Sequence, residues 1–296
     1  MKQSKNSAYK RIERDSTMIL NTERFGKVEY AIDNKEGTPV LIIHGIVGGY
    51  DQGVQTAKNL LPENQKYISI SRFGYLQSDI PANPTPSNQS KAFKMVLAHN
   101  EIKDVILLAT SAGGTIALKF AILYPDVVKG MILIGSGYPN KNKNKIPKGP
   151  PSFVYNDLFF TFFVNHMQGT LLKMFGVSKE QYKNASSYER KQFDDMMKTL
   201  LPVSPRKHGI INDNKVINPD MVKNYDTYPL EKLNIPILIL HAKNDPMASF
   251  GDMKEASKRL EHKKIIAYEE GGHVLFGHSK ENKQYISDFI NRYLNN

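Results

Sequence analysis

One serine stands where a buried apolar run gives way to a helical stretch. Ser111 follows the run 105–109 and precedes the stretch 112–123, with the small residues Ala109 and Gly113 two positions to either side. Small residues there allow a sharp strand-to-helix turn, which lifts the serine side chain above the sheet at the positive end of a helix dipole. The pattern therefore predicts a nucleophilic serine. A serine that only caps the following helix would give a similar local pattern.

A serine hydroxyl needs a base to remove its proton and a carboxylate to orient that base. Asp245 and His273 each follow an apolar run late in the chain. The order Ser111, Asp245, His273 is the order expected for a nucleophile at a strand-to-helix turn. All three are expected at the carboxyl ends of strands, where the sites of open α/β sheets lie. Asp252 is a weaker candidate for the acid, and turn chemistry or an ordinary loop histidine is the alternative for each residue alone.

A glycine-rich loop follows the apolar run 39–43. It has the sequence His44-Gly45-Ile46-Val47-Gly48-Gly49. Acyl transfer builds negative charge on the carbonyl oxygen of the substrate, and preset backbone N–H groups stabilise that charge. We expect the N–H groups of Ile46 and Ala112 to form this oxyanion hole, with His44, Gly45, Gly48 and Gly49 as its supporting loop. A flexible glycine turn without this role is the alternative.

The elements that must position these residues alternate along the chain. Short β-branched apolar runs without polar alternation are typical of strands buried on both faces of a parallel sheet. Such runs cover 39–43, 67–71, 105–109, 131–134, 237–240 and 265–268, and helical stretches cover 51–60, 87–99, 112–123 and 280–294. The alternation predicts the α/β class, a mostly parallel twisted sheet with helices on both faces. An antiparallel hairpin of 16–21 with 27–32 is expected at its edge.

The middle of the chain lacks runs of the strand type. It carries helical segments at 152–175 and 179–200. We therefore expect a helical cap at 138–230, inserted into a core formed by 1–137 and 231–296.

Aromatic residues are densest in the first half of the expected cap. Part of this face is expected to line an apolar pocket for an acyl or alkyl group. The candidate pocket residues are Phe159, Phe160, Phe163 and Met167. Packing of the cap onto the core is the plainer explanation for such a face, and contact with a membrane is a third. The segment 202–209 is expected to approach the site, without an assigned role.

Composition narrows the class of function. The chain of 296 residues has a formal net charge of +11, no cysteine and 40% hydrophobic residues. This apolar fraction suits a packed core, and the lack of cysteine excludes disulfides, thiolate metal sites and a cysteine nucleophile. Lysine and arginine are spread along the chain, with one dense cluster in a linker at 139–151, so we expect no nucleic-acid partner.

Several motifs are not found in the sequence. A phosphate-binding glycine loop and a zinc-protease motif are both missing, and we expect no metal and no cofactor. A secretion signal and a membrane-spanning stretch are not recognisable either. We therefore expect a cytoplasmic protein without stable membrane insertion, either a monomer or a homodimer, whose partner is a small-molecule substrate.

Together these motifs resemble those of the α/β-hydrolase superfamily. The matching residues are His44-Gly45, Gly48-Gly49, Ser71-Arg72-Phe73-Gly74-Tyr75, Ser78, Thr110-Ser111-Ala112-Gly113-Gly114, Asp245 and Gly272-His273. The resemblance is strongest to capped esterase- and lipase-like members. It implies that superfamily's fold, a Ser-His-Asp hydrolytic triad, no cofactor and a helical cap over the pocket. Ala109 stands where the superfamily pattern has glycine. Ser111 stands where the otherwise similar epoxide hydrolases and haloalkane dehalogenases carry aspartate.

The motifs and the resemblance together predict a serine hydrolase of the carboxylesterase type (EC 3.1.1). Its substrate would be a small or medium apolar carboxylic ester, cleaved through an acyl-enzyme. The same triad could instead cleave a carbon–carbon bond, a lactone, a thioester or an amide. From a different class, the chain could be a slow-turnover ligand-sensing or partner-activating protein that keeps the fold.

Overall fold

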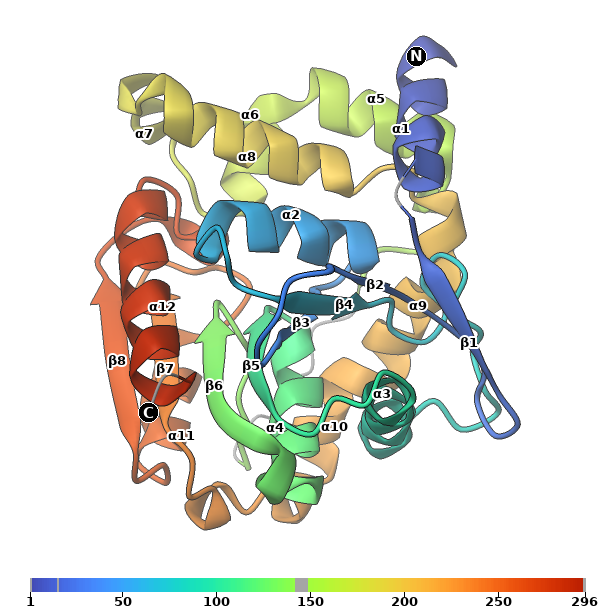
Figure 1. The fold of residues 1–296 in the computed structure, drawn as a ribbon. Helices are drawn as coiled ribbons and strands as arrows, with labels where there is room; N and C mark the ends of the chain where they lie inside the picture. Colours follow the sequence, from blue (N-terminus) through green and yellow to red (C-terminus); the bar gives the residue numbers. More distant parts are fainter. Residues whose placement is uncertain (1, 15, 142–148, 295–296) are drawn as a thin grey trace.

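A single twisted sheet organises the part of the chain that the structure describes (Figure 1). The structure is a computed structural model, and it describes residues 2–14, 16–141 and 149–294. Most of the linker predicted at 139–151, with its basic cluster, lies outside these residues. The strands are β1 Met18–Thr22, β2 Gly26–Ile32, β3 Val40–Ile43, β4 Tyr67–Ile70, β5 Val105–Thr110, β6 Val128–Ile134, β7 Ile237–Ala242 and β8 Lys263–Tyr268.

The order of the strands across the sheet is β1-β2-β4-β3-β5-β6-β7-β8. β2 is antiparallel to both of its neighbours, β1 and β4, and every pairing from β4 to β8 is parallel. The predicted edge hairpin and the mostly parallel α/β sheet are both confirmed. A parallel sheet of this kind places the carboxyl ends of its strands along one edge, where the candidate residues were expected.

The central strands are buried on both faces because successive side chains point to opposite sides. In β5, Leu107 and Ala109 belong to a cluster with residues of α3 and α4, whereas Ile106 and Leu108 belong to a cluster with residues of α2 and α12. The core helices are α2 Tyr50–Leu60, α3 Pro86–His99, α4 Gly113–Leu123, α11 Phe250–Ser257 and α12 Ser279–Leu294. Helices therefore cover both faces of the sheet, as the unbroken apolar runs predict.

The chain between β6 and β7 is helical. It contains α5 Asp157–His166, α6 Gln168–Met174, α7 Lys179–Asn184, α8 Ser187–Thr199, α9 Lys207–Asn212, a π-helical turn Asp213–Ile217, and α10 Asn218–Lys223. Each of the two predicted helical segments is divided in two. Ser186 begins α8 by accepting a hydrogen bond from the N–H of Glu189, an N-cap that starts a new helix.

The inserted helices fall into two parts. Figure 1 shows α5, α6, α7 and α8 as a layer beyond the carboxyl ends of the parallel strands. This layer has its own apolar cluster, which includes Leu171, Phe193 and Met197. Farther along, Ile217 and Met221 belong to the main core cluster, beside residues of α4. The cap boundaries at 138 and 230 stay a prediction. Within the inserted chain, the helical layer packs in its own apolar cluster, whereas the segment that follows it packs in the main core.

A helix that the sequence did not predict precedes the sheet. α1, Lys2–Arg14, packs against α5. Tyr9 donates a hydrogen bond from its hydroxyl to Asp157 of α5, and Tyr50 of α2 donates to the carbonyl of Ile12. These tertiary contacts hold α1 in place, and its strongly polar sequence has no apolar stripe. The sequence pattern therefore does not predict this helix.

The described helices include none with the length and apolarity needed to cross a membrane.

Candidate active site

Four loops meet at the carboxyl edge of the sheet. Because β3 and β5 are adjacent, with Ile43 opposite Ala109, the loop after β3 lies beside the turn after β5. β6, β7 and β8 follow on the other side of β5. Residues that are far apart in the sequence are therefore brought to one place by the strand order.

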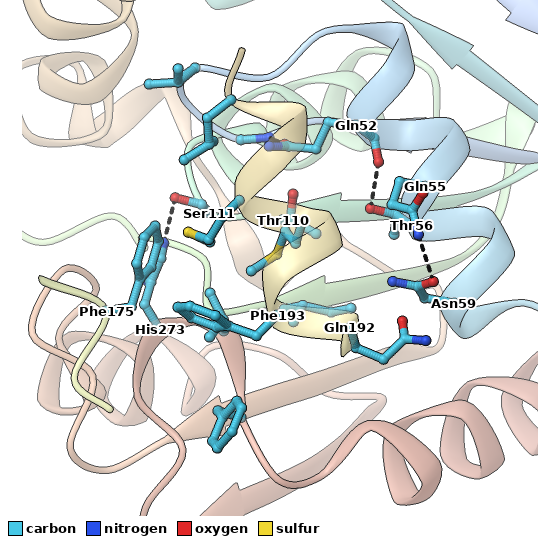
Figure 2. A pocket seen from close by; sticks show the side chains of 18 of the residues that line it. Gln52, Gln55, Thr56, Asn59, Thr110, Ser111, Phe175, Gln192, Phe193 and His273 are labelled. Atoms are coloured by element: carbon cyan, nitrogen blue, oxygen red, sulfur yellow. Dashed lines mark hydrogen bonds between the residues drawn. The ribbon is translucent and has the colours of Figure 1, made fainter. Parts of the chain in front are cut away.

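The structure brings Ser111, His273 and Asp245 into one hydrogen-bonded chain. His273 Nε2 lies 2.8 Å from Ser111 Oγ, a contact drawn as a dashed line in Figure 2. On the other side of the ring, Nδ1 lies 2.9 Å from Oδ2 and 3.1 Å from Oδ1 of Asp245. The weaker candidate Asp252 lies in α11 and accepts a hydrogen bond from Asn140. Asp245 is therefore the carboxylate that holds the imidazole.

Ser111 occupies a strained turn. Its φ is 52°, a left-handed backbone conformation that a residue with a side chain rarely adopts. Gly113 must be glycine, because a Cβ there would lie 2.8 Å from the carbonyl oxygen of His44 and closer still to that of Ile43. Gly45 also approaches closely, since a Cβ on it would lie 3.1 Å from the Cβ of Ser111. The small residues of both motifs let the loop after β3 pack directly on the serine turn.

The carboxylate of Asp245 is buried and ionised. Burial alone would raise its pKa, but hydrogen bonds outweigh burial and hold the pKa below its usual value. The contributions come from His273 and from the N–H groups of Ala248 and Met247, which donate to Oδ1 over 2.9 and 2.8 Å. A fixed negative charge beside Nδ1 keeps the proton on that nitrogen and leaves Nε2 as the acceptor of the hydrogen bond from the Ser111 hydroxyl.

The Asp245–His273 pair passes over the end of β6 because a glycine directly follows that strand. Gly135 has a φ of 51°, and a Cβ there would lie 2.6 Å from the carbonyl oxygen of His273. His273 is also tied to the helical layer above it. Its N–H donates to the carbonyl of Phe175 over 2.8 Å, and the Phe175 ring stacks on the imidazole with centroids 6.3 Å apart.

The two predicted oxyanion donors come from the two loops that pack together at Ser111. Ile46 is in the loop after β3, and Ala112 directly follows the serine. Among the described residues, neither N–H donates a hydrogen bond to another protein group. The role of these two N–H groups as oxyanion donors stays a prediction.

The Ile46 N–H is oriented through the carbonyl group of the same peptide. In a trans peptide the C=O of Gly45 and the N–H of Ile46 point in opposite directions. The Gly45 oxygen accepts hydrogen bonds from Arg72 Nη2 at 2.9 Å and from His44 Nδ1 at 2.8 Å. On the other side of Gly45, its N–H donates to Gln52 Oε1 over 2.9 Å. The position of the Ile46 donor is thus set by side chains that hold Gly45.

His44 is held as a neutral ring. Its Nε2 accepts a hydrogen bond from the N–H of Arg72 at 3.0 Å, so the ring proton is on Nδ1 and is donated to Gly45. Burial, together with the nearby charge of Arg72, lowers the pKa of His44 well below its ordinary value. His44 therefore donates to the loop as a neutral ring.

A buried ion pair secures Arg72. Its guanidinium binds Asp213 of the inserted segment through two hydrogen bonds of 2.6 and 2.7 Å, and the Tyr75 hydroxyl donates to the same carboxylate. In the sequence, Arg72 lies in a matching motif without an assigned role. Asp213 resembles any charged residue of a helix, so no sequence signal points to it.

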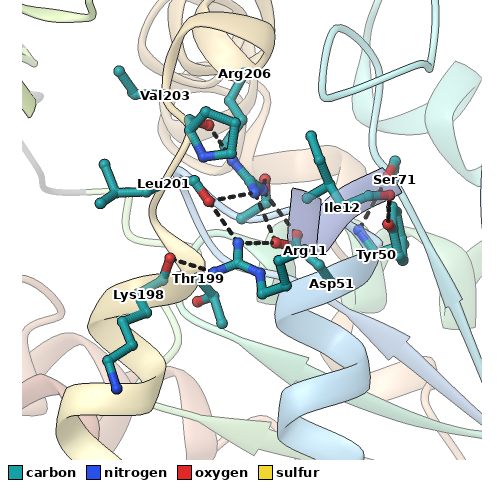
Figure 3. Close-up of polar contacts among 12 residues, drawn as sticks. Arg11, Ile12, Tyr50, Asp51, Ser71, Lys198, Thr199, Leu201, Val203 and Arg206 are labelled. Carbon is teal, nitrogen blue, oxygen red and sulfur yellow. Dashed lines mark hydrogen bonds and ion pairs between the residues drawn. The ribbon is translucent and has the colours of Figure 1, made fainter. Parts of the chain in front are cut away.

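A second arginine reaches the same loop from the segment 202–209. Arg206 is buried and donates to the carbonyl oxygen of Gly48 over 2.6 Å. It also binds both carboxylate oxygens of Asp51, at 2.9 and 2.8 Å, and Arg11 of α1 binds Oδ2 from the other side (Figure 3). This gives the segment 202–209 a structural role, because it holds the far end of the glycine loop.

A cavity of about 230 Å³ opens beside Ser111 and His273 (Figure 2). Most of its wall is apolar, and the helical layer contributes part of that wall. Of the four predicted pocket residues, Phe160 and Phe163 line the cavity. Phe159 and Met167 do not, and they are 48% and 37% exposed. This corrects the prediction: Phe159 lies one position away from the inward face of α5, and Met167 follows the end of that helix at His166, so neither side chain points into the cavity.

Metal ligation finds no support among the described residues, where no three His, Asp or Glu side chains gather closely enough to hold an ion.

In a comparison with known proteins, residues 38–278 of the chain match the model of a family described as "alpha/beta hydrolase fold". An AB hydrolase superfamily protein of Bacillus subtilis (strain 168), YisY, is 23% identical over 263 residues, which are 88% of this chain and 94% of that protein. Among solved structures, an alpha/beta hydrolase fold protein from Nakamurella multipartita matches with a TM-score of 0.74 at 21% identity, over 94% of this chain and 99% of that one. An esterase from Exiguobacterium antarcticum matches with a TM-score of 0.65 at 20% identity, over 95% and 100% of the two chains. At these identities the structural matches show the fold.

Proposed function

Because the chain belongs to the α/β-hydrolase fold family, we propose that it is a serine hydrolase of apolar carboxylic esters. The observation that carries the proposal is the chain of hydrogen bonds from Ser111 through His273 to Asp245. A serine, an imidazole and an ionised carboxylate in this arrangement suit nucleophilic attack on a carbonyl carbon.

The reaction would proceed through an acyl-enzyme. His273 takes the proton of Ser111 as its oxygen attacks the ester carbonyl, and then gives that proton to the departing alcohol. Asp245 stabilises the imidazolium that forms in between. Water activated by the same imidazole then releases the acid and restores Ser111. General-base help of this kind contributes roughly 10²–10⁴ to the rate.

The carbonyl oxygen becomes negatively charged in both steps. In the proposal it is held by the N–H groups of Ile46 and Ala112, which lie on the two loops that meet at the serine. Loss of one such donor costs roughly 10²–10³ in kcat. The side chains that fix Gly45 therefore matter for the rate, although none of them touches the substrate.

The cavity supports an ester with an apolar chain. Its walls include Phe160, Phe163 and Met197, which suit an acyl or alkyl group, and the neighbour from Exiguobacterium antarcticum is named an esterase. Cleavage of a lactone, thioester, amide or carbon–carbon bond by the same residues remains the alternative, since a shared fold does not fix a substrate. A slow-turnover ligand sensor is the alternative from another class.

The test is the hydrolysis of p-nitrophenyl butyrate by the wild type and by Ser111→Ala. We expect kcat/KM to fall by several orders of magnitude, about 10³ or more, because the nucleophile is lost. Ser90→Ala is the matched control, since Ser90 is buried in α3 and donates to the Pro86 carbonyl. Activity of the Ser111 variant within tenfold of the control would remove Ser111 from the mechanism.

A further inference from the structure

The cavity has a polar end remote from Ser111. It is lined there by Gln55 and Asn59 of α2, by Gln192 and Glu189 of α8, and by Ser279 and Asn282 of α12. Figure 2 shows Asn59 and Gln192 together at one end of the cavity and the Ser111–His273 pair at the other, with Phe193 between them. A chain that begins at the serine would therefore pass apolar side chains before it meets polar ones.

A buried acceptor at this end lacks a partner. In the part of the chain that the structure describes, Gln192 Oε1 is shielded from solvent and receives no hydrogen bond. Buried polar atoms of folded proteins are nearly always paired, so an unpaired one in a cavity wall points to a ligand. Across from it, Gln55 donates to Asn59 Oδ1 over 2.9 Å, and both side chains line the cavity.

The charge at this end decides between neutral and anionic ligands. Glu189 accepts two hydrogen bonds from Ser279, one from the N–H at 3.1 Å and one from the hydroxyl at 2.7 Å. Lysine and arginine are missing from the described lining of the cavity, and its one histidine, His273, is at the serine end. A carboxylate or phosphate would therefore meet a negative charge without a cation to bind it.

We propose that this polar end binds an uncharged O–H or N–H group carried at the far end of the substrate's apolar chain. The proposal rests on the proposed ester hydrolysis and names the class of substrate for it. The ligand donates a hydrogen bond to Gln192 Oε1, and Gln55 and Asn59 offer a second acceptor and a donor. The substrate is thus an ester whose chain ends in a neutral hydrogen-bonding group, rather than a plain alkyl or an anionic ester.

The experiment compares three series of p-nitrophenyl esters of graded chain length, ending in a methyl, a hydroxyl or a carboxylate group. At the length that reaches Gln192, wild-type kcat/KM for the hydroxyl ester should exceed that for the methyl ester by about fivefold, the worth of one hydrogen bond. The carboxylate ester should be the poorest substrate at the same length. The same chains on fluorophosphonate probes report the preference through the rate of Ser111 labelling, without any turnover.

The variant Gln192→Leu removes the acceptor and keeps the size of the side chain. It should lose the preference for the hydroxyl ester, so that its kcat/KM for the hydroxyl ester no longer exceeds that for the methyl ester of the same length. The control is Gln284→Leu on the outside of α12, where Gln284 donates to the exposed Asp288. This control should keep the wild-type preference.

Two failures are distinguishable. Turnover or labelling of Ser111 without a hydroxyl preference at any chain length would overturn this inference and leave the proposed function standing. Absence of both turnover and labelling in the folded wild type would overturn the proposed function, and this inference with it.

Discussion

The guanidinium of Arg72 and the carboxylate of Asp213 form a buried, two-pronged ion pair with N–O distances of 2.6 and 2.7 Å. Arg72 belongs to the core, and Asp213 belongs to the inserted segment. The same guanidinium binds the carbonyl oxygen of Gly45, which fixes the direction of the neighbouring Ile46 N–H. The inserted segment therefore takes part in shaping the loop that is proposed to hold the oxyanion.

Asp213→Asn should lower kcat more than it changes KM, because Arg72 would lose the partner that aims it at Gly45. It should also lower the free energy of unfolding by about 3–5 kcal/mol, since a buried charge is left unpaired. Denaturant unfolding and ester kinetics measure both effects. Glu231→Gln is the control, because its ion pair with Arg259 is largely exposed and is worth at most about 1 kcal/mol. An Asp213 variant with unchanged kcat and stability would contradict this role.

The ionisation of Asp51 should make the free energy of unfolding depend on pH in the acidic range. Burial alone would raise its pKa, but Arg206 and Arg11 outweigh burial and hold the pKa below its ordinary value. The folded state therefore keeps Asp51 ionised at a pH where the unfolded chain takes up a proton, at about 4 and below. The stabilisation is complete at neutral pH and is lost as the pH falls through the lowered pKa.

Asp51→Asn should thus reduce the free energy of unfolding strongly at pH 7 and less at pH 3.5, as measured by denaturant titration at both values. Asp104→Asn serves as the comparison, because the contact of Asp104 with Lys129 is exposed. Equal losses at the two pH values would show that the ionisation of Asp51 does not contribute.

Gly135→Ala should impair the active site through a steric contact. The new Cβ would lie 2.6 Å from the carbonyl oxygen of His273, so the backbone of His273 or the residue after β6 must shift, and the imidazole is carried with the first of these. We expect kcat to fall and the free energy of unfolding to drop by about 1–3 kcal/mol. Gly37→Ala has the same left-handed backbone strain, at φ 92°, with nothing within 4 Å of the Cβ, and should leave kcat unchanged. Equal kcat in the two variants would argue against a close approach at Gly135.

Phe160→Ala and Phe159→Ala should differ in their effect on substrate preference, because Phe160 lies on the inner face of α5 and Phe159 on its outer face. Phe160 lines the cavity and Phe159 is exposed, so only the first change enlarges the pocket. We expect Phe160→Ala to shift the preference of the enzyme toward bulkier acyl groups, measured as kcat/KM over a series of esters. A shift of equal size in Phe159→Ala would place the substrate elsewhere.

The sheet and the cluster at its carboxyl edge follow from local patterns. Short β-branched runs identify the strands, and a parallel sheet must bring the residues that follow those runs to one edge. Ser111, Asp245 and His273 could therefore be placed together without coordinates. The small residues around Ser111 indicate that two backbone segments approach closely there, and small residues can be recognised from the sequence alone.

Contacts between segments that are distant in the sequence could not be predicted from local patterns. Arg72 and Asp213 are 141 positions apart, and their pairing depends on where the inserted helices pack. The choice between Phe159 and Phe160 depends on the rotation of α5 by a single residue, because the whole stretch is aromatic. α1 is held by Tyr9 and Arg11 through partners in three other segments, and its own sequence has no apolar stripe to reveal it.

The central claim is that His273 activates Ser111 as a nucleophile. The most direct measurement is the rate of covalent labelling by a fluorophosphonate, with the modified residue mapped by mass spectrometry in the wild type and in His273→Ala. The proposed mechanism predicts rapid attachment of a single adduct to Ser111, slowed by about 10² or more when the imidazole is removed. A folded wild-type protein that stays unlabelled at Ser111, or that is labelled equally fast without His273, would contradict it.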